Sequence, residues 1–114
     1  MAISAAIRSA VEATFAADQQ LGVLDRLSTI PEPSPVDLRL RPEAEYLQAA
    51  VVVLAYGDLG IFDGQVINAC VEPRDVIYVL QSPGWMQPGL TRQELVRRYR
   101  ELKLPVPDLL AADA

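Results

Sequence analysis

Residues 42–57 read PEAEYLQAAVVVLAYG, and this stretch decides the fold. Pro42 suits the first position of a helix, and Glu43 and Glu45 place carboxylates in the first turn, where they offset the positive end of the helix dipole. Gly57 is a natural stop, because glycine adopts the left-handed conformation in which many helices end. These signals predict one helix from Pro42 to Gly57.

Within that helix no face is polar. In residues 46–56 the only polar side chain apart from the two tyrosine hydroxyls is Gln48. A helix that is apolar on all sides must be surrounded by other elements, and each buried valine or leucine contributes roughly 1.5–3 kcal/mol. The alternative is a buried strand over residues 49–55, since residues 51–53 are β-branched valines. The start and stop signals and the length of the run favour the helix.

Composition predicts one ordinary globular domain. The chain has 114 residues, of which 51% are hydrophobic and 22% charged, enough for one core but not for two. No run approaches the ~20 apolar residues that span a bilayer, and residues 1–14 lack the pattern of a signal peptide. We therefore expect a single domain over residues 1–114, a cytoplasmic location and no membrane partner.

The residue types that most often carry catalysis or bind metals are scarce. The chain has no histidine, one lysine (Lys103) and one cysteine (Cys70), which excludes Ser-His and Cys-His nucleophiles and cysteine-rich zinc sites. Asp58, Asp63 and Asp75 do not follow the spacing of a calcium-binding EF-hand loop, so we interpret them as solvated turn carboxylates. The prediction is a protein that is not an enzyme, with no catalytic, cofactor-binding or metal-binding residues.

Before the central helix, we expect a helix over residues 4–28 that breaks near residues 18–20, where its apolar stripe shifts. Its apolar stripe either packs on the central helix or forms a dimer seam. Residues 31–35 read PEPSP and predict a stiff connector. Residues 36–41 alternate apolar and charged side chains, which is the period of a half-buried strand.

After the central helix, the glycines of residues 57–64 indicate turns rather than a phosphate-binding loop. Residues 65–71 and 76–81 predict the two strands of a hairpin. The position of Pro73 conflicts with this hairpin, because proline cannot adopt the positive φ that the favoured two-residue turns require. Pro73 could equally start a short helix. The sequence leaves this alternative open.

Residues 82–89 form a turn-rich loop that carries Trp85, the only tryptophan, followed by Met86. Trp85 either folds back as a lid on the core or is an exposed anchor for a partner. These two interpretations carry equal weight from sequence alone.

Residues 91–94 read TRQE, a capping box, so a helix begins here and runs to about Lys103. Its arginines gather near the C-terminal end of the helix, where cations are favoured. Arg97, Arg98 and Arg100 either form a solvated face or bind phosphate or an acidic partner. Residues 105–114 contain two prolines and predict a loosely held tail.

The predicted order is helix, strand, helix, hairpin, helix, which indicates an α+β fold with a short antiparallel sheet packed on the buried central helix. The predicted function is that of a non-catalytic accessory or assembly module that binds another protein or itself, as a homo-oligomer. Its predicted partner-binding residues are Trp85, Met86, Arg97, Arg98 and Arg100. The alternative is a nucleic-acid-binding regulator that uses the arginine face, which the net charge of −5 disfavours.

Overall fold

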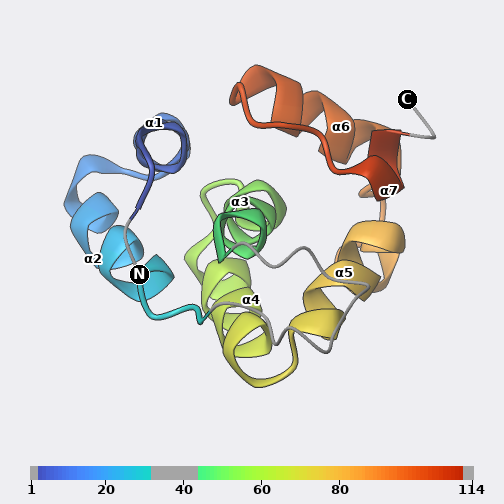
Figure 1. The fold of residues 1–114 in the computed structure, drawn as a ribbon. Coiled ribbons are helices and arrows are strands. Elements are labelled where there is room, and N and C mark those ends of the chain that lie inside the picture. The colour runs from blue at the N-terminus through green and yellow to red at the C-terminus, as the bar shows by residue number, and fades with distance from the viewer. Residues whose placement is uncertain (1–2, 32–43, 112–114) are drawn as a thin grey trace.

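The computed structural model describes residues 3–31 and 44–111, and every regular element in those ranges is helical (Figure 1). In chain order the elements are α1 (Ala5–Thr14), α2 (Ala17–Leu27), α3 (Ala44–Ala55), α4 (Leu59–Val71), α5 (Pro73–Gln81), the short 3-10 helix η1 (Pro83–Trp85), α6 (Arg92–Glu101) and α7 (Asp108–Ala111). The predicted α+β class is therefore wrong. The predicted strand over residues 36–41 and most of the connector over residues 31–35 lie outside the described ranges.

The central helix is confirmed from Ala44 onward, and its predicted start at Pro42 lies outside the described ranges. In Figure 1, α3 lies in the middle of the molecule, and α1, α4, α5 and α6 all pack against it. Ala44 and every residue from 47 to 55 are buried, as expected for a helix with no polar face. Gln48, the polar residue in this apolar run, has a hydrogen-bond partner: its Nε2 donates a hydrogen bond of 3.3 Å to the carbonyl oxygen of Leu27. The core of the protein is therefore built around this one helix.

The predicted glycine stop is also confirmed. After α3, Tyr56 has φ of 45° and Gly57 has φ of 94°, so the chain leaves the helix through positive φ. A Cβ atom at Gly57 would lie 2.5 Å from the backbone oxygen of Thr14, at the end of α1. Glycine is required here both for its backbone conformation and for the close approach of α1.

The predicted hairpin is wrong, because residues 65–71 end α4 and residues 73–81 form α5. Asp58 starts α4 by accepting a hydrogen bond of 3.0 Å from the backbone N–H of Ile61, and Pro73 occupies the first turn of α5. Val76 and Leu80 are buried while Tyr78 between them is 59% exposed, so helical spacing rather than alternation matches the core. The alternative in which Pro73 starts a helix is the correct one.

The glycines after the central helix are likewise not all turn residues. Gly60 and Gly64 lie inside α4, although the glycine spacing predicted turns over residues 57–64. Packing overrides their low helix propensity, since α4 contacts both α3 and α5.

The N-terminal helix breaks earlier than predicted. The break between α1 and α2 falls at Phe15 and Ala16, both of which are extended, while Gly22 is accommodated within α2. Phe15 is buried and meets the ring of Phe62 edge-on, with centroids 5.5 Å apart. Because Ile7, Val11 and Phe15 are all buried, the apolar stripe of α1 belongs to the core rather than to a dimer seam.

The predicted start of the C-terminal helix, with Thr91 as its N-cap, is confirmed. Thr91 Oγ1 accepts a hydrogen bond of 3.1 Å from the backbone N–H of Glu94, and the flanking Leu90 and Leu95 are buried. The predicted loose tail is wrong for residues 105–111. Leu110 of α7 is fully buried, which fixes this segment on the core.

Candidate interaction surface

Trp85 is the most exposed large apolar side chain in the described ranges, with 93% of its area accessible. It lies on a rigid turn: the backbone N–H of Trp85 bonds to the carbonyl of Ser82, and the N–H of Met86 bonds to the carbonyl of Pro83, which is itself buried. The exposed-anchor interpretation of Trp85 therefore fits the structure, and the lid interpretation does not.

Trp85 does not stand alone. Tyr78 on α5 is 59% exposed, and the positions Tyr78, Gln81, Ser82 and Trp85 follow helical spacing from α5 into η1. Together with Val79, these residues line a shallow hollow of about 300 Å³. We refer to the five residues Tyr78, Val79, Gln81, Ser82 and Trp85 as the Trp85 surface.

The segment around this surface carries no charge. Between Asp75 and Arg92, none of residues 76–91 is an acidic or basic residue, in a chain where 22% of residues are charged. The centres of protein–protein interfaces are depleted in charged residues and enriched in tryptophan and tyrosine. The Trp85 surface has both properties.

Met86, predicted to bind a partner beside Trp85, faces the protein instead. It is half-buried against the core, and Gln65 Nε2 donates to its sulfur at 3.2 Å. Because Gln65 is itself buried on α4, this contact holds the turn against the helix. Met86 thus positions the Trp85 surface.

Arg98 also turns inward. Its side chain is only 11% exposed, and Nη1 donates hydrogen bonds of 3.1 Å to the carbonyl of Val53 and 3.4 Å to that of Leu54. The guanidinium lies 4.5 Å from the ring centroid of Tyr56. A cation at the C-terminal end of a helix satisfies carbonyls that have no partner within the helix. Arg98 therefore caps α3.

Arg97 is exposed, but its charge is paired with carboxylates of the same helix. It forms ion pairs with Glu94, at 2.6 Å, and with Glu101 on the same helix. The hydrogen bond from Arg97 lowers the pKa of Glu94, while the pKa of Glu101 is lowered first by the hydroxyl of Tyr56 and then by Arg97. Of the three predicted arginines, Arg100 alone is exposed with no ion pair to another described residue. The structure thus does not bring the three arginines together as a free cationic face.

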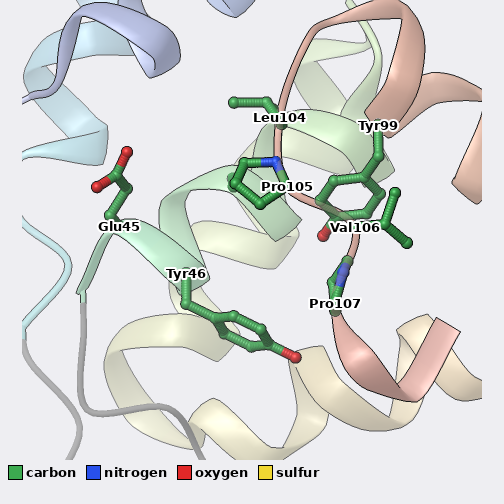
Figure 2. A pocket seen from close by; sticks show the side chains of 8 residues that line it. Glu45, Tyr46, Tyr99, Leu104, Pro105, Val106 and Pro107 are labelled. Atoms are coloured by element: carbon green, nitrogen blue, oxygen red, sulfur yellow. The ribbon is translucent and has the colours of Figure 1, made fainter. Parts of the chain in front are cut away.

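A second concave feature was not predicted from the sequence. A hollow of about 170 Å³ lies between the start of α3, the end of α6 and residues 104–107, a strap that follows α6 (Figure 2). We call it the Tyr99 hollow; its lining residues are Glu45, Tyr46, Ala49, Tyr99, Leu104, Pro105, Val106 and Pro107. Tyr99 is not among the candidate residues identified from the sequence, and nothing in the sequence indicates that Pro105 and Pro107 face α3.

The Tyr99 hydroxyl is the unusual group in this hollow. Tyr99 is 1% exposed, and its hydroxyl has no hydrogen-bond partner among the described residues. Burial, followed by the nearby Tyr46, raises the pKa of Tyr99. A buried polar atom without a partner costs about 1–3 kcal/mol, so the position calls for an explanation.

The raised pKa of Tyr99 predicts a loss of stability at alkaline pH. Above the ordinary tyrosine pKa of about 10 the unfolded chain releases the Tyr99 proton while the folded protein keeps it, so the free energy of unfolding falls as pH rises. The loss approaches about 1.4 kcal/mol per pH unit for this one proton. Denaturant unfolding of the wild type and Tyr99→Phe between neutral and alkaline pH measures it. Equal slopes in both proteins would contradict the assignment.

The acidic residues that the structure describes do not gather into a metal site. Within residues 3–31 and 44–111, no three histidine, cysteine, aspartate or glutamate side chains are placed to hold one ion. Asp58 caps α4, and Asp63 forms an ion pair with Arg26 of α2. Across the same part of the chain, every helix is too short or too polar to cross a bilayer.

Comparisons of the chain with protein-family models, with curated proteins and with solved structures found no match.

Proposed function

We propose that the protein is a non-catalytic interaction module that self-associates through the Trp85 surface. The observation that carries this proposal is Trp85 itself, 93% exposed on a hydrogen-bonded turn. A tryptophan side chain buries about 150–250 Å² when it is covered, which makes it one of the most frequent interface hot spots. The hydrogen-bonded turn adds to this, because the loop has little backbone freedom left to lose on binding.

The shape of the surface favours a second copy of the chain as the partner. The same surface contains a projecting group, Trp85, and the hollow beside it that Tyr78 and Val79 line. A two-fold symmetric dimer requires a patch that is complementary to itself. Two copies related by a two-fold axis would each place Trp85 against the hollow of the other.

Charge supports the same arrangement. Two copies of a chain with net charge −5 repel each other, and the repulsion is strongest where acidic groups meet. Because residues 76–91 are uncharged, contact through this segment brings no like charges face to face.

Trp85→Ala is expected to weaken self-association about 30-fold, as for a hot spot of about 2 kcal/mol. The variant should keep its fold, since Trp85 contributes little to the core. Sedimentation velocity over a concentration series measures the change. In the wild type, the emission of this single tryptophan should also shift to shorter wavelength as concentration rises.

The matched control is Leu21→Ala, which removes another exposed apolar side chain, 81% accessible and located on α2. This variant should associate as the wild type does. A wild type that stays monomeric at all concentrations, or a Leu21→Ala variant as impaired as Trp85→Ala, would refute the proposal.

The alternative function, nucleic-acid binding through the arginines of α6, gains no supporting observation. Arg98 caps α3, and Arg97 is held by Glu94 and Glu101. Phosphate binding depends on cations that are free to exchange counterions for the nucleic-acid backbone. We therefore do not propose it.

A further inference from the structure

The Tyr99 hollow has an unusual balance of polar groups. Among the described residues that line it, Glu45 is the only charged one, so a bound anion would meet a carboxylate there and no described cation. Pro105 and Pro107 contribute two further lining positions without a backbone N–H. The remaining surface is mainly aromatic and aliphatic, from Tyr46, the Tyr99 ring and the strap. This combination suits a ligand that is apolar, donates hydrogen bonds and carries positive charge.

We propose that the Tyr99 hollow binds a small aromatic amine in its protonated form, with the ammonium group at Glu45 and a hydroxyl at the opposite end that pairs with Tyr99. This site is independent of the proposed self-association, since it shares no lining residue with the Trp85 surface.

The carboxylate end is held in place by α1. Glu45 Oε1 accepts a hydrogen bond of 2.8 Å from Ser4 Oγ, which fixes the side chain at the rim of the hollow. The second carboxylate oxygen stays available to an ammonium ion. Aromatic faces such as that of Tyr46 also attract organic cations.

The opposite end is defined by the Tyr99 hydroxyl. Figure 2 shows its oxygen turned towards the space that the lining residues enclose, on the side away from Glu45. The hydroxyl is buried without a partner, so a ligand hydroxyl that reached it would satisfy an atom that the free protein leaves unpaired. Because the atom is covered in the free protein, a ligand that pairs with it must displace part of the lining of the hollow.

The volume of the hollow sets the size of the ligand. About 170 Å³ is close to the ~150 Å³ of cavities that hold a single benzene molecule, so the hollow accepts one aromatic ring with short substituents. Larger ring systems would have to displace the strap formed by residues 104–107.

Three probes of one shape test the proposal: tyramine, phenethylamine and phenylacetate. Ligand-observed NMR and calorimetric titration of the wild-type chain should give an affinity order of tyramine, then phenethylamine, with phenylacetate not bound. The phenolic hydroxyl of tyramine should strengthen binding about fivefold over phenethylamine, as expected for one hydrogen bond. Glu45→Gln should weaken both amines about threefold, as for a solvent-exposed ion pair.

Tyr99→Phe gives the sharpest result. It should remove the difference between tyramine and phenethylamine while leaving phenethylamine binding unchanged, because only the hydroxyl pair is lost. The matched control is Glu12→Gln, an exposed carboxylate on α1 that does not line the hollow. Failure of both amines to bind, equal binding of phenylacetate, or a tyramine preference that survives Tyr99→Phe would overturn the proposal.

Discussion

Gly57→Ala is expected to destabilise the protein by about 3 kcal/mol or more, because it combines two penalties. The backbone at Gly57 has φ of 94°, which strains any residue with a Cβ atom. The new Cβ would also lie 2.5 Å from the backbone oxygen of Thr14, so α1 would have to move. The free energy of unfolding from urea denaturation, followed by helical circular dichroism, measures the loss.

Substitutions at two other glycines allow the backbone penalty and the contact penalty to be measured separately. Gly89 has a similar φ of 91° but open space around a Cβ, so Gly89→Ala should cost only the backbone term, about 1–2 kcal/mol. Gly64 lies inside α4 with nothing within 4 Å, so Gly64→Ala should stabilise the protein by about 0.5–1 kcal/mol. If Gly57→Ala costs no more than Gly89→Ala, the contact with α1 is relieved without cost and our account of this turn is wrong.

Arg98→Ala is expected to destabilise the protein by about 2–4 kcal/mol. The substitution removes both hydrogen bonds to the carbonyls that end α3 and the stacking of the guanidinium on Tyr56. The carbonyls of Val53 and Leu54 would then lose a charged donor at a buried helix end, since both residues are fully buried. Thermal and denaturant unfolding at neutral pH both report this change.

The neighbouring arginines provide the controls. Arg97→Ala should change the free energy of unfolding by only about 0.2–1 kcal/mol, because the ion pairs of Arg97 with Glu94 and Glu101 lie at the solvent-accessible surface of α6. Arg100→Ala should be nearly neutral, as for most surface substitutions. An Arg98→Ala variant as stable as these two would show that the cap on α3 is dispensable.

Both large effects fall at the same end of α3, where the last turn of α1 and the side of α6 meet the central helix. The Trp85 surface lies elsewhere, on α5 and η1. Variants that test self-association should therefore leave the stability of the core unchanged, and variants of the core need not alter the exposed surface.

Local signals in the sequence were sufficient for the central helix and for α6. The first has no polar face and ends at Gly57, and the second begins at a capping box whose Thr91 hydrogen bond is formed. Such signals act between residues a few positions apart, so they can be read from the chain alone. The uncharged segment around Trp85 could also be seen in the sequence, although its exposure could not.

Residues 65–81 were assigned wrongly because short apolar segments fit a strand and a helix equally well. The tertiary structure decided between them: α3 offers apolar surface on every side, and α4 and α5 cover it with helical stripes such as Val76 and Leu80. Arg98 and Tyr99 show the same limit of prediction from sequence. The hydrogen-bond acceptors of Arg98 lie more than 40 positions away in the chain, and the surroundings of Tyr99 depend on the strap beyond α6. What the sequence by itself determined was the buried helix and its C-terminal end at Gly57, which depend on neighbouring residues. What only the tertiary structure decided was which side chains are buried and which are exposed, because burial is set by the elements that pack together in space.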